Sequence, residues 1–246
     1  MTDFDKTLGK KRFSIKKFFW IVYKVFLFWL IFTLIQVIVL KWAPVAFTPT
    51  MFFRSIGAYL QGKDARIYYQ WASYAQISDH AKVAVVASED QRFPRHFGMD
   101  LAALNEAVKD YKTRGRLRGG STISQQVAKN VFLWQGGGFV RKALEIPYTL
   151  LIELIWGKQR ILEVYLNIAE MGPQTFGVQA ASKRFFRKTA KNLSPTEAAT
   201  LAAVLPSPLR YSAQSPSYYI NLRSQQIQYQ MRMLGGFSYL QGLRKF

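Results

Sequence analysis

Two adjacent acidic residues, Glu89 and Asp90, end the apolar run AKVAVV and begin a loop with basic residues, a histidine and a glycine. Acids are scarce in this chain, which has 14 acidic and 34 basic residues. Because neighbouring residues on a helix point in different directions, one carboxylate can face a cleft while the other supports the loop. A solvated helix end is the simpler interpretation of the pair taken alone.

A polar stretch at 118–130, RGGSTISQQVAKN, follows two glycines. A helix that begins near Ser121 would offer backbone N–H groups to an anion. In that helix Thr122, Gln126 and Lys129 are spaced by four and three residues and therefore share a face. A polar stripe that ends in a cation suits a sugar carrying a phosphate, whereas an ordinary capped helix is the alternative.

A second acid, Glu145, stands four residues after Arg141 in VRKALE, so the two share a helix face. An exposed salt bridge of this kind is the simple interpretation, worth only about 0.3–0.5 kcal/mol. Pro147 removes a helical amide donor, which predicts a kink that could aim Glu145. Further on, Asn167 lies in an apolar stretch and is a candidate buried polar anchor.

The elements that must position these residues are mainly helices, because alternating strand patterns are scarce. Helix start and stop signals predict segments at 78–90, 100–115, 121–133, 139–171, 194–205 and 219–234. The clearest start is a capping box formed by Ser194 and Glu197, with Pro195 at the first helical position. We therefore predict a single, mainly helical domain.

The N-terminal region predicts a membrane anchor. A basic tail at 1–17 precedes an apolar run at 18–40, which as a helix is about 35 Å long. A bilayer core is about 30 Å thick. Because basic residues precede the run, we expect a cytoplasmic N-terminus, an uncleaved single-pass anchor, a membrane-proximal connector at 41–70 and an exported domain at 71–246. A buried core helix is the alternative for 18–40.

The formal net charge of +20 favours polyanionic partners, namely nucleic acid, an anionic membrane or a phosphate-bearing substrate. Since most of the chain is expected outside the cytoplasm, nucleic acid is disfavoured and phosphorylated lipids are favoured. The chain has no cysteine, which excludes disulfides and thiolate metal sites.

Five stretches stand in the order of the five motifs of the family 51 glycosyltransferases, the peptidoglycan glycosyltransferases, which this chain resembles over about residues 70–212. They are ASEDQRFPRHFGMD, RGGSTISQQVAKNVFLW, VRKALE, RILEVYLNIAEMG and FGVQAASKRFFRK. The chain ends soon after them and has no S-x-x-K beyond the basic tail, so it resembles the monofunctional members. The resemblance implies a mainly α, lysozyme-like domain at 71–246, with a head lobe and a jaw lobe that dips toward the membrane.

The resemblance also implies a reaction, the polymerisation of lipid II into linear glycan strands. The acceptor 4-hydroxyl attacks the anomeric carbon of the lipid-linked nascent glycan with inversion, and undecaprenyl pyrophosphate leaves. Glu89 matches the general base, and Glu145 matches a second acid that assists departure directly or through Mg²⁺ or Mn²⁺, with no metal ligand assigned. The positions implied for substrate binding are Asp90, Phe93, His96, Gly120, Ser121, Thr122, Gln126, Lys129, Arg141, Lys142 and Asn167.

One position departs from the family pattern. Many relatives carry an arginine in the loop before Arg141, where this chain has Gly137. One expected phosphate contact is therefore missing. Two alternatives are open: Arg141 or a more distant arginine substitutes for it, or diphosphate binding is weaker. An arginine introduced at this position is expected to tighten binding of a diphosphate.

The resemblance places the enzyme in a bacterial inner membrane with its catalytic domain in the periplasm. Its expected partners are lipid II, the lipid-linked nascent glycan, the membrane and other cell-wall synthesis proteins, and its expected roles are in the cell wall and cell shape. Two alternatives stay open, a lysozyme-like enzyme that cuts glycan and an assembly protein with an inactive site. The Gly-Gly-Ser-Thr motif argues against the first, and the two glutamates argue against the second.

Overall fold

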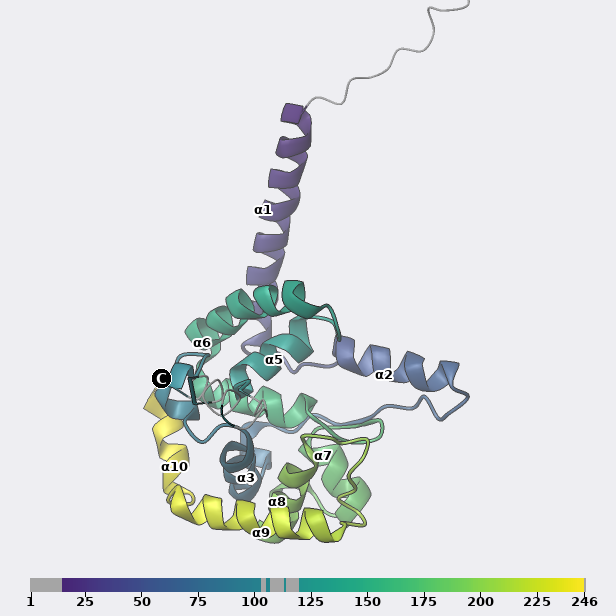
Figure 1. Cartoon of the computed structure of the whole chain (residues 1–246), viewed down its shortest axis with the longest axis vertical. Helices are drawn as coiled ribbons and strands as arrows, with labels where there is room; N and C mark the ends of the chain where they lie inside the picture. The colour runs from purple at the N-terminus through teal and green to yellow at the C-terminus, as the bar shows by residue number, and fades with distance from the viewer. Residues whose placement is uncertain (1–14, 103–104, 107–112, 114–119, 246) are drawn as a thin grey trace, which may run out of the picture. The chain divides into compact units, whose positions relative to one another are not determined.

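The computed structural model describes residues 15–102, 105–106, 113 and 120–245 (Figure 1). The predicted basic tail at 1–17 and the predicted helix at 100–115 lie mostly outside these residues. The chain divides into two compact units, Met1–Val39 and Leu40–Phe246. In the first, helix α1 (Ile15–Leu40) contains one stretch, Lys16–Leu40, that is long and apolar enough to cross a membrane.

The second unit is mainly helical, which confirms the predicted class. Its helices are α2 (Pro49–Leu60), α3 (Asp79–Glu89), α5 (Ile123–Phe132), α6 (Gly138–Ile168), α7 (Val178–Ala181), α8 (Pro195–Val204), α9 (Tyr218–Met233) and α10 (Ser238–Gln241). Single turns join them at η1 (Tyr74–Gln76), η2 (Phe93–Arg95), η3 (Ser182–Phe186), η4 (Ala190–Asn192) and η5 (Gly242–Lys245). A small sheet has the order β1 (Tyr68–Tyr69), β3 (Thr175–Phe176), β2 (Glu170–Gly172), with β1–β3 parallel and β2–β3 antiparallel.

Helix α3 forms the centre of the core. Its residues from Ala81 to Ala87 are all buried, and α8 and α9 pack against it. Alanine and valine dominate both α3 and α8, so the helices can approach closely. Glu89 is the last residue of α3, so the packing of this helix fixes the position of Glu89 at the edge of the core.

Helix α6 is long and has one internal break. The dihedral angles stay helical at Pro147 and depart from helical values at Gly157, where φ is 73° and ψ is 165°. Glycine adopts positive φ without a steric penalty, which permits the break at Gly157. The break at Gly157 therefore divides α6, and the kink expected at Pro147 stays a prediction.

The second half of α6 contacts the start of the predicted connector at 41–70. The guanidinium of Arg160 donates hydrogen bonds to the carbonyl oxygens of Leu40 and Ala43, at 2.9 and 2.5 Å, and lies 5.0 Å from the centre of the Trp71 ring. The connector also contains a helix that was not predicted, α2, whose N-terminus is capped by the side chain of Thr48. The chain before α3 is therefore fastened to the core.

Asn167 is fully buried, and it confirms the expectation of a buried polar anchor. Its Nδ2 donates to the carbonyl oxygens of Ala72 and Glu163, both at 2.8 Å, and its Oδ1 accepts the N–H of Ala72 at 2.8 Å. One amide thus satisfies both backbone groups of a residue that lies 95 positions away in sequence.

We expect Asn167→Ala to destabilise the fold. The substitution leaves the buried N–H and C=O of Ala72 without partners, at about 1–3 kcal/mol for each group. The free energy of unfolding in denaturant should fall by about 2–6 kcal/mol. The matched control is Asn221→Ala, because Asn221 is exposed and makes one long bond of 3.4 Å to Pro216. Equal losses for the two variants would contradict the anchoring role.

Candidate active site

The two adjacent acids at the end of α3 have different surroundings. Both carboxylate oxygens of Asp90 lie 3.0 Å from Nε2 of His96, and Oδ2 accepts the backbone N–H of Ile123 at 3.0 Å. Ile123 is the first residue of α5, where helix N–H groups have no partner inside the helix. Asp90 therefore joins the end of α3 to the start of α5 and supports the loop between them.

Glu89 points elsewhere and meets the side chain of Gln126. Nε2 of Gln126 donates to Oε2 of Glu89 at 2.9 Å, and Oε1 of Gln126 accepts the hydroxyl of Tyr165 at 3.2 Å. Tyr165 is buried, so it fixes which end of the amide faces the carboxylate. Glu89 is thereby held as a hydrogen-bond acceptor.

Burial raises the pKa of Glu89 above its ordinary value of 4.5. The hydrogen bond from Gln126 and the positive charge of Arg223 act in the opposite direction, and the charge of Asp90 adds to the rise. A carboxylate with a raised pKa binds a proton more readily, which is a property of a general base.

The second glutamate, Glu145, is only 2% exposed and lies among cations. Its Oε2 is 2.7 Å from Nη1 of Arg141, and its Oε1 is 2.5 Å from Nζ of Lys142. Burial lowers the pKa of Lys129, and the negative charge of Glu145 acts against that lowering. Three cationic side chains therefore surround one carboxylate, and the cluster has excess positive charge.

Helix α5 brings the two glutamates into one site. Gln126 contacts Glu89, and Lys129, one turn later, interacts with Glu145, so the predicted shared face exists. The third member of that face, Thr122, is the N-cap of α5 in a capping box with Gln125. Its hydroxyl donates to the carbonyl oxygen of Gly98 at 2.5 Å, so Thr122 fixes the loop as well as the helix.

A cavity of about 240 Å³ opens beside Glu89. Among the described residues, its walls include the predicted positions Asp90, Gly120, Ser121 and Thr122, and also Gln91, Arg92, Asp100 and Glu106. The structure thus brings the Gly-Ser-Thr motif and the acid pair to one cavity.

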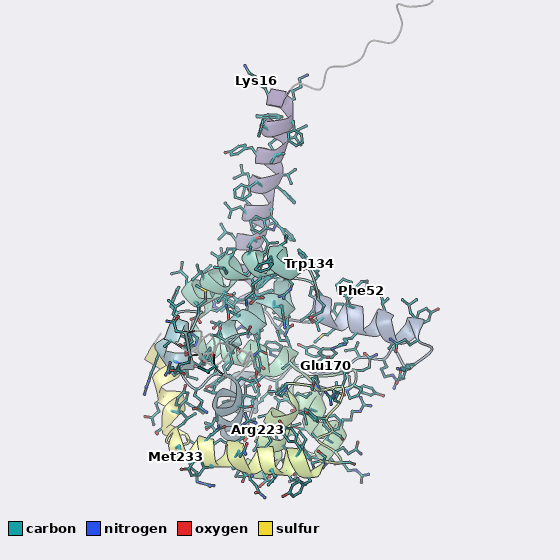
Figure 2. The ribbon with its side chains drawn as sticks, viewed as in Figure 1. Lys16, Phe52, Trp134, Glu170, Arg223 and Met233 are labelled. Carbon is teal, nitrogen blue, oxygen red and sulfur yellow. The ribbon has the colours of Figure 1, made fainter. Side chains whose placement is uncertain are left out.

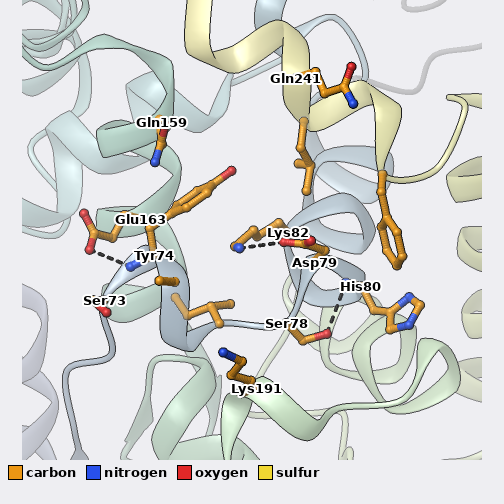
Figure 3. A pocket seen from close by; sticks show the side chains of 14 residues that line it. Ser73, Tyr74, Ser78, Asp79, His80, Lys82, Gln159, Glu163, Lys191 and Gln241 are labelled. Carbon is orange, nitrogen blue, oxygen red and sulfur yellow. Dashed lines mark hydrogen bonds and ion pairs between the residues drawn. The ribbon is translucent and has the colours of Figure 1, made fainter.

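A larger cavity, of about 940 Å³, lies at the opposite end of α3 (Figure 3). Its walls include Lys82, which pairs with Asp79 at 2.7 Å and lies 4.0 Å from the centre of the Tyr74 ring. The described part of its lining contains none of the predicted site residues. Size alone therefore does not identify the site, and we place it at the smaller cavity.

Three predicted substrate residues lie in the packed interior. Phe93 is fully buried, with the ammonium of Lys158 4.5 Å from its ring centre, while His96 contacts Asp90, and Asn167 binds backbone. In this structure all three contact other groups of the protein.

Sequence reasoning missed a buried network under the site. Glu153 pairs with Lys158 at 2.6 Å and accepts the hydroxyl of Ser124 at 2.5 Å. It also missed Arg223 on α9 (Figure 2). An acid and a lysine five residues apart in an apolar helix were the signal for the network, but no local pattern pointed to Arg223.

Gly137 caps the start of α6 with φ of 84°. A Cβ atom added there would lie 2.7 Å from Nε1 of Trp134. The expected gain from an arginine at this position therefore fails on backbone strain and on a clash. Arg141 lies beside this loop, and its Nε donates to the carbonyl oxygen of Gly136 at 2.6 Å.

Comparison with known proteins gives consistent results. Residues 57–232 match a family model described as transglycosylase. Three similar proteins are named biosynthetic peptidoglycan transglycosylase. The one from Pasteurella multocida is 49% identical over 87% of both chains, and the one from Pseudomonas aeruginosa is 47% identical over 91% of this chain and 97% of its own. The one from Xanthomonas campestris is 51% identical over 85% of both chains.

We expect the carboxyl group of Glu89 to titrate above 4.5 in the folded chain. Gln126→Met should raise its midpoint further, because it removes a hydrogen bond that stabilises the charged form. The measurement is carbon NMR of labelled glutamate side chains, with Glu89→Gln used to assign the resonance. A midpoint at or below 4.5, or one that Gln126→Met lowers, would contradict this description.

Proposed function

Because the chain belongs to the transglycosylase family, we propose that it polymerises lipid II into linear glycan strands of peptidoglycan and releases undecaprenyl pyrophosphate. The broad class, a peptidoglycan glycosyltransferase, is supported by the family match and by relatives of that name that align over most of their length. The observation that carries the specific reaction is the pairing of a proton-accepting carboxylate with a separate cationic cluster on one helix, α5.

Glu89 is the residue suited to activate the nucleophile. Its carboxylate borders the cavity and takes the proton from the 4-hydroxyl of the acceptor as that oxygen attacks the anomeric carbon of the donor. The raised pKa of Glu89 makes this transfer more favourable than it would be for an exposed carboxylate. A positioned base typically contributes about 10²–10⁴-fold to the rate.

The cationic cluster is suited to the leaving group. As the glycosidic bond breaks, negative charge develops on the pyrophosphate oxygens, and fixed cations stabilise it. Lys129, Arg141 and Lys142 supply three positive charges against the single negative charge of Glu145. In this arrangement Glu145 holds Arg141 and Lys142 in place through its two oxygens.

The residues around Glu145 do not fit a divalent metal site. Mg²⁺ and Mn²⁺ take several oxygen ligands, yet both oxygens of Glu145 face cations. In the part of the chain that the structure describes, no group of three or more His, Asp or Glu side chains could hold a metal. We therefore derive no step through a metal ion.

The proposed location is the inner membrane, with the catalytic unit in the periplasm. Helix α1 can cross a bilayer, and basic residues precede it in the sequence, which favours a cytoplasmic N-terminus. The anchor keeps the enzyme at the membrane, where a lipid-linked substrate is found. The excess of basic residues suits a pyrophosphate and anionic headgroups. Other wall-synthesis proteins are the proposed partners.

A hydrolase that cuts neutral glycan is the competing function. It also needs a catalytic acid, but it has no use for three cations around Glu145. Product analysis separates the two functions, because polymerisation lengthens strands made from lipid II whereas hydrolysis shortens existing glycan.

We expect Glu89→Gln to lower the rate of lipid II polymerisation at least 100-fold, since the amide keeps the shape but cannot accept the proton. The matched control is Glu106→Gln, because Glu106 borders the same cavity but is exposed and pairs with Arg92 at 3.2 Å. The control should keep most of the activity, and both variants should keep the wild-type melting temperature. More than a tenth of the wild-type rate in folded Glu89→Gln would reject the base assignment.

A further inference from the structure

The exposed face of α9 has an unusual composition. The helix buries Ile220, Ser224, Ile227 and Met231 against the core. The opposite face of a surface helix is normally charged. Here it carries five residues that we call the tyrosine face: Tyr218, Tyr219, Leu222, Tyr229 and Met233. Their exposed fractions run from 40% for Leu222 to 80% for Tyr218.

Aromatic and polar groups extend this face. The ring centres of Tyr211 and Tyr219 are 5.4 Å apart, so the aromatic surface continues into the loop before α9. Gln225 and Gln226 are exposed between the tyrosines. The guanidinium of Arg232 lies 5.9 Å from the centre of the Tyr229 ring.

The surrounding sequence has only one sign of charge. Neither α9 nor the loops that flank it, residues 205–237, contain an aspartate or glutamate, whereas this segment has three arginines, at positions 210, 223 and 232. A face built on this segment is complementary to a negatively charged partner.

The chemistry of the face fits a hydroxyl-rich polymer. Aromatic rings offer flat apolar area with a polar edge, glutamine amides both donate to and accept from hydroxyl groups, and arginine pairs with carboxylates. A lipid bilayer fits less well, since burying the amides of Gln225 and Gln226 in hydrocarbon is unfavourable. The exposed side of α2 shows the contrast, because it carries one charged residue, Arg54, among the apolar and aromatic residues Phe52, Phe53, Ile56, Tyr59 and Leu60.

The face is also connected to the active site. Helix α9 packs against α3, which ends at Glu89. Figure 2 places Arg223 and Met233 on this one helix, and the positive charge of Arg223 acts on Glu89. The hydroxyl of Tyr239, just beyond α9, donates to the carbonyl oxygen of Gln91 at 3.0 Å.

We propose that the tyrosine face of α9 binds the peptide-bearing glycan strand that the active site produces. The identity of this ligand rests on the proposed function, since the strand is its product. The sugar rings lie against the tyrosines, and the carboxylates of the peptides pair with the flanking arginines. The face thus retains the strand near the enzyme between additions.

Binding of preformed strands tests this proposal. Soluble peptide-bearing glycan strands are immobilised, and the full chain in detergent is passed over them at low salt. We expect the double variant Tyr218→Ser, Tyr229→Ser to bind at least tenfold more weakly than the wild type. The matched control is Tyr59→Ser, Leu60→Ser on α2, which should bind as the wild type does. All four positions are exposed, and equal melting temperatures would show that folding is preserved.

Wild-type affinity in the α9 double variant would overturn the proposal. The same comparison is made with anionic vesicles that contain no glycan. If the α9 double variant loses binding only to these vesicles, the face binds a membrane and the proposal is overturned. The test needs no turnover, and Glu89→Gln should bind strands as tightly as the wild type. A chain that binds strands through α9 but makes none from lipid II would refute the proposed reaction and leave this surface in place.

Discussion

The carboxylate of Asp90 accepts the first backbone N–H of α5 and contacts His96, and the geometry of the site depends on this joint. A buried carboxylate at a helix N-terminus satisfies an unpaired donor and is favoured by the helix dipole. With the end of α3 fixed to the start of α5, Gln126 can reach Glu89. One turn later on α5, Lys129 interacts electrostatically with Glu145. A single helix thereby sets the relation between the two glutamates.

The two glutamates have different electrostatic surroundings, and this difference suits them to different roles. Burial keeps the pKa of Glu89 high, with a neutral amide as its direct partner. Glu145 instead contacts Arg141 and Lys142. Two carboxylates in different environments can therefore serve as a proton acceptor and as an organiser of positive charge. The positive excess around Glu145 suits a departing pyrophosphate.

Local spacing was enough to predict the helical class and the shared face of Gln126 and Lys129, because helix periodicity is written in neighbouring residues. It was not enough where partners are distant in sequence. Tyr165 fixes an amide 39 positions away, and Asn167 binds the backbone of Ala72, 95 positions away.

Chemical rescue tests the central claim, that Glu89 is the proton acceptor, most directly. Glu89→Ala enlarges the cavity of about 240 Å³, so that formate can occupy the place of the lost carboxylate. The account predicts that the residual rate of lipid II polymerisation by Glu89→Ala rises with formate concentration, while wild type and Glu145→Ala do not respond. A rate that formate leaves unchanged, in a variant shown to be folded, would contradict the role of Glu89 as the base.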